Sequence, residues 1–254
     1  MVFRHAIARS PCRAIVRGLS TAGLGEPDYG RAVEQHREYL AALRSCGLNL
    51  TVLPSIEEYP DSVFVEDTAV CTPYCAVVSR PGAPSRRGEA ELIAPVLSGF
   101  YSQVERIVEP GTLDAGDVMV AGSHCFVGLS SRTNEAGAAQ LIAILEQYGM
   151  SGSTIPVEAG LHLKSSVAYL GEGRVLGTRN LLSLSEFRSY RRIEVPDEEA
   201  YASNCIWVNG RIIMPAGHPM TRSRIGTLGC PVIEVDTSEF RKLDGGVSCL
   251  SLRF

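Results

Sequence analysis

A cysteine close to the C-terminal end of the sequence is the residue best suited to covalent chemistry. Cys249 follows Gly245 and Gly246, and a short apolar and polar alternation after it predicts a strand. The two glycines allow the backbone to turn sharply or to approach a ligand closely. Cys249 is therefore either a presented nucleophile or a small core residue, since free cysteine is among the most buried residue types.

A cysteine nucleophile needs a partner that moves protons, and His162 is the best-placed histidine in the chain. It stands in Leu161-His162-Leu163-Lys164, at the start of a predicted pair of strands. Apolar neighbours on both sides also fit a core histidine whose nitrogens are satisfied. The pattern thus indicates either a general acid and base for Cys249 or a structural side chain.

Carboxylates gather where apolar runs end. Glu66 and Asp67 stand together after a run that opens at Asp61, and Asp114 and Asp117 bracket a turn of small residues. Charges flanked by strand-like apolar residues are costly when they are buried without a partner. These carboxylates therefore lie either in exposed hairpin turns or in an acidic pocket that binds a cation.

Arginines in two segments offer the complementary charge. Arg86 follows a loop rich in proline and glycine, and Arg132 lies between a predicted strand and a predicted helix. Each is either solvated or one half of a bidentate carboxylate clamp. Taken together, acids for a cationic end, arginines for an anionic end and a Cys/His pair fit a zwitterionic amino acid with a cationic side chain.

The elements that must position these residues recur along the chain at intervals of roughly forty to fifty residues, which is typical of a repeated unit. An opening strand is expected at His5–Arg9, and strand pairs at Ser62–Val78, Leu113–Leu129, Leu161–Gly177, Ala202–Pro215 and Val247–Phe254. The dipeptide Asn209-Gly210 is a strong signal for a two-residue hairpin turn.

Helices are expected between the strand pairs. Their apolar spacing places them at Asp28–Cys46, Ser85–Phe100, Glu135–Tyr148 and Pro219–Leu228, with Pro95 expected to kink or break the second. The chain thus repeats strand, strand and helix about five times, which favours radial repetition over a doubly wound sheet. No glycine-rich dinucleotide fingerprint follows a strand.

Composition narrows the function classes. The 254 residues are 45% hydrophobic and 20% charged with a net charge of −4, which predicts one globular domain over 1–254 and disfavours nucleic acid as a partner. No apolar run is long enough for a bilayer. The eight cysteines show no metal-ligand spacing, so we expect no metal site and a reducing, cytoplasmic setting.

Six motifs in order give the sequence a family resemblance. They are Phe64-Val65-Glu66-Asp67, Leu113-Asp114-Ala115-Gly116-Asp117, Ser131-Arg132-Thr133-Asn134, Leu161-His162-Leu163-Lys164, Asn204-Cys205-Ile206-Trp207-Val208-Asn209 and Asp244-Gly245-Gly246-Val247-Ser248-Cys249. Together they resemble the dimethylarginine dimethylaminohydrolase family of the guanidino-group-modifying (pentein) superfamily. The resemblance covers about residues 4–254 and implies an α/β fold, a five-bladed α/β propeller of ββα-type units with pseudo-fivefold symmetry around a central active site.

The same resemblance implies an activity. The expected reaction is hydrolysis of Nω-methylated arginines to citrulline and methylamine or dimethylamine, without a cofactor and through a covalent thiouronium on cysteine. Cys249 would be the nucleophile, His162 the general acid and base, and Asp114 the residue that orients His162. The implied substrate contacts are Leu19, Asp61, Phe64 and Leu243 in the pocket lining, Glu66 and Asp67 at the guanidinium, and Arg86 and Arg132 at the α-carboxylate.

Two other functions remain open at this point. An arginine deiminase would use the same catalytic set on unmethylated arginine and release ammonia, although such enzymes usually carry an inserted helical domain that this chain lacks. A non-catalytic amino-acid-binding propeller with a buried Cys249 is the other alternative. The expected partner is a small-molecule substrate, with no nucleic acid and no membrane, and the resemblance is compatible with a homodimer.

Overall fold

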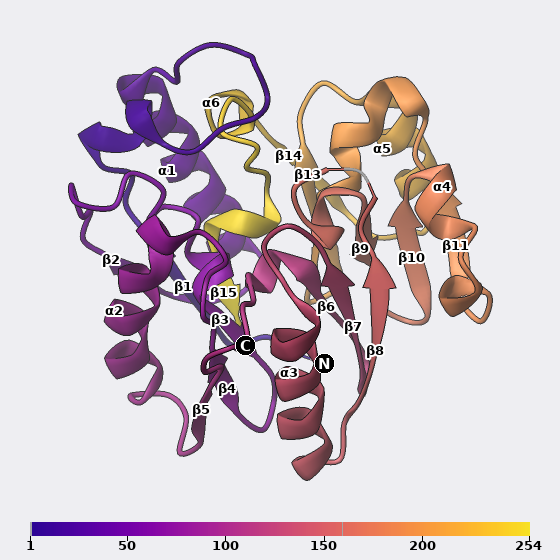
Figure 1. Cartoon of the computed structure of the whole chain (residues 1–254). Helices are drawn as coiled ribbons and strands as arrows, with labels where there is room; N and C mark the ends of the chain where they lie inside the picture. The colour runs from indigo at the N-terminus through magenta and orange to yellow at the C-terminus, as the bar shows by residue number, and fades with distance from the viewer. Residues whose placement is uncertain (1, 159) are drawn as a thin grey trace.

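Five three-stranded sheets surround a common axis in the computed structural model, which describes residues 2–158 and 160–254 (Figure 1). The sheets are β15-β1-β2, β3-β4-β5, β6-β7-β8, β9-β10-β11 and β12-β13-β14. The strand bounds are β1 His5–Arg9, β2 Asn49–Leu53, β3 Ala69–Cys71, β4 Ala76–Val78, β5 Val104–Arg106, β6 Val118–Ala121, β7 His124–Leu129, β8 Ser151–Pro156, β9 Val167–Tyr169, β10 Arg174–Gly177, β11 Arg191–Glu194, β12 Ile206–Val208, β13 Arg211–Pro215, β14 Val232–Val235 and β15 Leu252–Arg253.

Each sheet is built in the same way. An inner strand pairs antiparallel with the middle strand, and the middle strand pairs parallel with an outer strand. A parallel neighbour requires a crossover connection, and a helix usually supplies it. The expected five-bladed α/β propeller is thereby confirmed, and the repeating unit is strand, strand, helix, strand.

The sequence patterns did not predict the third, outer strand of each unit, and for two of these strands the reason is physical. The outer strands lie at the sheet edges, and two of them, β5 and β11, read Val-Glu-Arg and Arg-Arg-Ile-Glu. Charged residues are favoured on edge strands because they discourage pairing with other chains. Such a strand shows no apolar alternation, although it completes the sheet.

The helices lie on the outside of the ring (Figure 1). Their bounds are α1 Tyr29–Ser45, α2 Arg87–Leu97, α3 Glu135–Gln147, α4 Arg179–Leu182, α5 Pro219–Gly226 and α6 Ser238–Arg241. The helix at α1 begins as expected, because the Asp28 side chain caps it by accepting a 2.7 Å hydrogen bond from Arg31 N. Pro95 does not end α2, which continues to Leu97.

Short 3₁₀ turns precede the inner strands and form the centre of the molecule. They are η2 Val65–Thr68, η4 Ala115–Asp117, η5 Leu163–Ser165, η7 Asp197–Ser203 and η8 Ser248–Leu250, beside η1 Arg13–Arg17, η3 Pro84–Arg86 and η6 Ser185–Phe187 elsewhere. Successive central turns pack against one another around the axis. The Glu66-Asp67 pair, expected at the end of a strand, lies in η2 instead.

The two ends of the chain close the ring together. The expected C-terminal strand is shortened to Leu252–Arg253 because Ser248–Leu250 forms η8, and this short β15 pairs with β1 through Ile7 and Leu252. Arg4 N and His5 N both donate 2.8 Å hydrogen bonds to Phe254 O. The sheet whose edge strand β15 follows Cys249 therefore depends on residues from both ends of the chain.

Among residues 2–158 and 160–254, no helix combines the length and the apolar character that crossing a lipid bilayer requires.

The pairing of β15 with β1 predicts that Leu252 in β15 contributes to the free energy of unfolding. Leu252 is 4% exposed and packs with Ile7 and Val65, whereas Leu24 is 51% exposed. We expect Leu252→Ala to lower the free energy of unfolding by about 2–5 kcal/mol, because it leaves a cavity in the core. The matched Leu24→Ala should change it by less than about 0.5 kcal/mol. Urea unfolding of both variants measures the difference, and equal midpoints would contradict the closure.

Candidate active site

Most of the predicted site residues line one small cavity, here called the front cavity. Its wall contains Leu19, Asp61, Phe64, Asp67, Arg86, Arg132, His162, Leu243 and Cys249, together with Ser20, Thr21, Leu161, Asp244 and Gly245. These residues come from segments far apart in the sequence, and the central turns bring them together. The pairing of a cysteine and a histidine, expected from residue types alone, is thus present in space.

Cys249 is buried in the second position of η8. Its Sγ accepts a hydrogen bond from Gly246 N at 3.4 Å. Burial, followed by the nearby carboxylates of Glu66 and Asp67, raises the pKa of the Cys249 thiol to about 12. The thiol is therefore neutral at physiological pH while the cavity holds no cation.

His162 is held by a carboxylate. Its Nε2 lies 3.0 Å from Asp114 Oδ2, and both side chains are buried. Burial lowers the pKa of His162, but Asp67, Asp114 and Asp117 outweigh it and raise that pKa to about 9. The pKa of Asp114 is in turn lowered, because its partners overcome the effect of burial. His162 is thus an imidazolium at neutral pH and is ready to donate a proton.

Two hydrogen-bond donors, Gly116 N and Arg86 Nη1, hold the carboxylate of Asp67 in place. Its Oδ1 accepts a 3.0 Å hydrogen bond from Gly116 N, and its Oδ2 lies 2.5 Å from Arg86 Nη1. Arg86 is also bound by Glu89 at 2.7 Å and by the Phe64 carbonyl at 3.0 Å. Arg86 therefore lies in the cavity wall, as expected, with most of its donors already used to hold neighbouring groups.

Arg132 has more freedom than Arg86. The ion pair recorded for it within the described residues is a 3.8 Å contact of Nη1 with Asp114 Oδ2. On the opposite wall, Asp61 Oδ1 accepts a 2.9 Å hydrogen bond from Leu19 N, and burial raises the pKa of this carboxyl. Leu19 is thereby fixed at the cavity edge, where it faces solvent with 41% of its surface.

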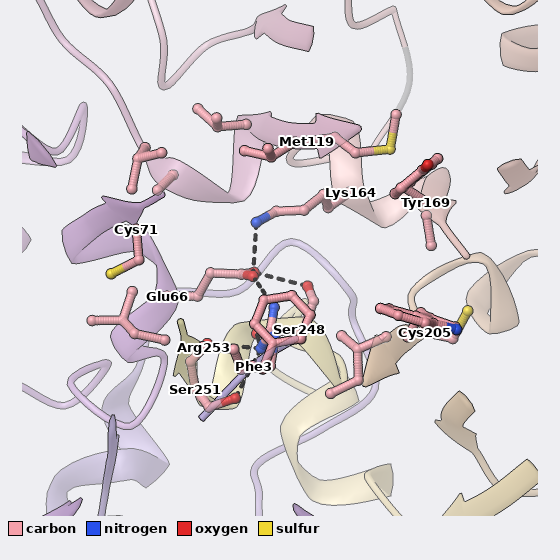
Figure 2. Close-up of a pocket in the computed structure, with 18 of the residues that line it drawn as sticks. Phe3, Glu66, Cys71, Met119, Lys164, Tyr169, Cys205, Ser248, Ser251 and Arg253 are labelled. Carbon is pink, nitrogen blue, oxygen red and sulfur yellow. Dashed lines mark hydrogen bonds and ion pairs between the residues drawn. The ribbon is translucent and has the colours of Figure 1, made fainter. Parts of the chain in front are cut away.

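Glu66 is a correction to the expected site, because its carboxylate does not line the front cavity. It points into a second, larger cavity and bonds to Lys164 Nζ at 2.7 Å, Arg253 Nη2 at 3.0 Å and Ser248 Oγ at 2.8 Å (Figure 2). Neighbouring residues in a 3₁₀ turn point in different directions, so Glu66 and Asp67 cannot both face one ligand. Asp67 alone faces the front cavity.

Two residues that position the site, Asp117 and Asn204, were not assigned this role from the sequence. Asp117 accepts hydrogen bonds from Ser130, Thr133 and the backbone N of Leu163, which fixes the turn beside His162. Its position in a motif with Asp114 was the available signal. The residues around it contribute no charge pattern of their own.

Asn204 has the same role beside Cys249. Its side chain accepts from Ser248 N at 2.8 Å and donates to Ser248 Oγ and to the Lys164 carbonyl, both at 3.1 Å. It thus ties together the turns that carry the cysteine and the histidine. An asparagine in a loop gives no sequence signal for such a role.

The glycines near Cys249 serve packing. A Cβ on Gly245 would collide with the Phe64 ring, and a Cβ on Gly246 would come within 2.5 Å of the Asn204 side chain. The residue with left-handed backbone in this turn is Asp244, at φ 59°. Gly245 also lines the front cavity, so close approach of this backbone to a ligand stays a prediction beside its packing role.

Asp67, Asp114 and His162 also form the cluster best suited to a metal ion. Their ligand atoms lie within 4.8 Å of one another. In the described structure, however, Asp67 is engaged by Arg86 and Asp114 by His162, so each ligand would have to leave a partner of opposite charge to bind a cation. The expectation of a site without metal stays a prediction.

Comparison with known proteins points in one direction. A family model described as N,N dimethylarginine dimethylhydrolase, eukaryotic, matches residues 27–170. The chain is 55% identical to N(G),N(G)-dimethylarginine dimethylaminohydrolase from Pseudomonas aeruginosa, and the similarity covers 100% of both chains.

Solved structures agree with this similarity. The dimethylarginine dimethylaminohydrolase of Pseudomonas aeruginosa, as a C249S variant complexed with citrulline, matches with a TM-score of 0.99 at 54% identity and covers 100% of both chains. An H162G adduct of a dimethylarginine dimethylaminohydrolase with S-methyl-L-thiocitrulline matches with a TM-score of 0.98 at 54% identity and the same coverage.

The carboxylates around His162 can be tested directly. We expect Asp114→Asn to lower the pKa of His162 from about 9, because it removes a hydrogen-bonded carboxylate that stabilises the imidazolium. NMR titration of the imidazole measures the change. The exposed Asp197→Asn is the matched control and should leave that pKa in place. A His162 pKa unmoved by Asp114→Asn would contradict the assignment.

The same histidine predicts a pH dependence of stability. Its pKa in the folded protein is raised from an ordinary 6.5 to about 9, so its stabilising contribution is full below pH 6.5 and is lost as pH rises through about 9. The free energy of unfolding should fall across this window in the parent chain. The fall should be smaller in Asp114→Asn when urea unfolding is repeated at each pH.

Proposed function

Because the chain belongs to the dimethylarginine dimethylaminohydrolase family, it is a hydrolase of Nω-methylated arginines, and we propose that Cys249, His162 and Asp114 perform the reaction in the front cavity. The observation that carries this assignment is that Cys249, His162 and Asp67 line one cavity. Two of the solved structures support this assignment. One is a C249S variant with citrulline and the other an H162G adduct, and both match 100% of this chain.

The substrate itself activates the nucleophile in this proposal. A guanidinium carbon is a poor electrophile because its charge is delocalised, so a thiolate is needed. The resting thiol has a pKa of about 12 because it is buried near Glu66 and Asp67. A guanidinium bound against Asp67 neutralises that carboxylate and adds a positive charge, and both changes lower the thiol pKa. The displaced proton leaves to solvent.

The first half of the reaction releases the amine. The Cys249 thiolate forms a bond to the guanidinium carbon, which gives a tetrahedral adduct. His162, protonated at rest, donates its proton to the methylated nitrogen, and the carbon–nitrogen bond breaks. The products of this half are methylamine or dimethylamine and a thiouronium on Cys249. Asp114 keeps the imidazole ring oriented throughout, through its 3.0 Å contact with Nε2.

The second half releases citrulline. The now neutral His162 takes a proton from water as the water oxygen attacks the thiouronium carbon. The adduct then loses the Cys249 thiolate and a proton, which the free amine takes up in solvent. His162 is again an imidazolium and the thiolate regains a proton when citrulline leaves. Every step uses residues of this chain and water, so no cofactor is required.

The walls of the front cavity match the two ends of the substrate. Asp67 holds the guanidinium, while Phe64, Leu19 and Leu243 surround the aliphatic part. Arg132 binds the α-carboxylate, and Arg86 contributes the one Nη1 hydrogen left over from its bond to Asp67. Asp61 completes the wall and holds Leu19 through its backbone N.

We extend the proposal to the whole chain and its setting. Residues 1–254 act as one catalytic domain, of which residues 1 and 159 lie outside the described structure. A reducing cytoplasmic location is supported by eight free cysteines. A homodimer stays a prediction, which sedimentation equilibrium of the purified protein decides.

Replacing the nucleophile separates binding from chemistry. Cys249→Ser should lower citrulline formation by at least about 10³-fold, because an alkoxide is not formed under these conditions. Binding of dimethylarginine should stay measurable by calorimetry. The half-buried Cys230, which does not line the front cavity, is the control, and Cys230→Ser should keep the parent rate. Full activity of Cys249→Ser would refute the nucleophile.

Removing the proton carrier should trap the intermediate. His162→Gly lacks both the acid for amine release and the base for water, so turnover should stop at or before the covalent adduct. Mass spectrometry of the intact protein after reaction with S-methyl-thiocitrulline, whose leaving group needs no proton, should show a stable added mass on Cys249. An unchanged steady-state rate would show that His162 has no role.

Substrate preference tests the activity against its nearest alternative. Citrulline release should be faster from monomethylarginine or asymmetric dimethylarginine than from arginine by at least about tenfold in kcat/KM, or about 1.4 kcal/mol. Ammonia and methylamines are measured in the same reactions. Arginine as the best substrate would instead establish a deiminase, and no release from any of the three would leave an amino-acid-binding propeller.

A further inference from the structure

The larger cavity, which the proposed reaction does not use, lies along the propeller axis. It has a volume of about 370 Å³, within the range of small-molecule sites. The inner strand of every sheet contributes to its wall, through β3, β6, β9, β12 and β15. We call it the axial cavity, and Figure 2 shows its charged end.

The charged end of the axial cavity carries more positive than negative charge. Glu66 is the carboxylate there, and it faces the two cations Lys164 and Arg253, so the group has a net charge of +1. Glu66 is shared between them through Oε1, while its Oε2 accepts from Ser248. One carboxylate therefore serves two partly buried cations.

Lys164 is the cation with donors to spare. Within the described residues, the polar contact recorded for Nζ is the 2.7 Å ion pair with Glu66, and an ammonium carries three hydrogens. Figure 2 shows this nitrogen between the strand walls, at the boundary of the cavity. Buried charges are stable when they are paired, so this end of the cavity favours an anion as its occupant.

Most of the remaining wall is apolar. It includes side chains from three different inner strands: Val118 and Val120, Val167, and Ile206 with Trp207. An occupant therefore needs an anionic head for Lys164 and an apolar body of moderate size for these strands. A phosphate or a dicarboxylate would leave charge against apolar walls without compensation.

The mouth of the axial cavity lies away from Cys249. Gly122 belongs to the hairpin turn between β6 and β7, and Gly171 with Glu172 to the turn between β9 and β10, and these turns line the cavity at its other end. Glu172 is exposed and paired with Arg174 at 2.6 Å, which leaves the cationic end as the place where an anion is attracted. An occupant can enter from this side while substrate fills the front cavity.

We propose that the axial cavity is a second binding site, which takes a small monocarboxylate with an apolar chain or ring. The carboxylate bonds to Lys164 and the body lies against the inner strands. The head would rest beside Ser248 and Glu66, the chain neighbours of Cys249 and Asp67. The site is thus separate from the front cavity and shares the central turns with it.

The sequence provides a reporter for this site, because Trp207 is the one tryptophan of the chain and lines the cavity. Hexanoate is the probe, with hexylammonium and hexanol as matched probes of the same length. Hexanoate should change the Trp207 fluorescence saturably, and should bind at least tenfold more tightly than either control. Calorimetry on the same samples measures binding independently of fluorescence.

Two variants locate the binding. Lys164→Gln removes the proposed carboxylate partner and should weaken hexanoate binding at least tenfold, without a comparable effect on hexanol. Val120→Phe fills the cavity, leaves the charges in place and should weaken both. Circular dichroism checks that each variant is folded, and the cavity-filling variant decides the question if Lys164→Gln is not.

A competition experiment separates the two cavities. In Cys249→Ser, saturating citrulline should leave the affinity for hexanoate within about threefold of its value in free protein. Displacement of hexanoate by citrulline would place it in the front cavity and overturn the proposal. No saturable binding by calorimetry, or equal binding of hexanoate and hexanol, would overturn it as well.

Discussion

The buried carboxylate of Glu66 is the interaction on which the centre of the molecule depends. It joins Lys164 in η5, Ser248 in η8 and Arg253 in β15, and therefore connects the turns that carry or flank Asp67, His162 and Cys249. Removal of one partner from a buried ion pair costs about 3–5 kcal/mol, because it leaves a charge uncompensated. The catalytic distances thus rest on a group that does not touch the front cavity.

The turn η2 separates two cavities of different charge, because its neighbouring residues Glu66 and Asp67 point into different ones. Asp67 faces a cavity that receives a cation, while its neighbour Glu66 faces one that carries excess positive charge. The resting protein keeps a neutral thiol beside an imidazolium, as their shifted pKa values require. In the proposed reaction a thiolate forms when a guanidinium is present, which limits side reactions of Cys249 in the empty cavity.

The sequence could predict the units and the main reactive residues, because strand alternation and hairpin turns are local signals. His5–Arg9, α1 and the Asn209-Gly210 hairpin follow such signals, and the order of the motifs placed Cys249 with His162. The outer strands β5 and β11 were missed because their charged residues suit a sheet edge and break the apolar alternation. The direction of Glu66 could not be predicted, since one residue of a 3₁₀ turn decides which cavity a side chain faces. Asn204 was missed because its partners lie on other units.

The repeated 3₁₀ turns have a consequence for how such a molecule can change through evolution. The same kind of turn presents side chains to the axis from five units, and each unit keeps its own sheet, while the buried clusters lie between neighbouring units. New chemistry can therefore arise by exchange of single residues in the turns, while the sheets that carry them are conserved by packing. We therefore expect the residues of the sheets to reflect the shared fold, and the residues of the central turns to differ with the reaction.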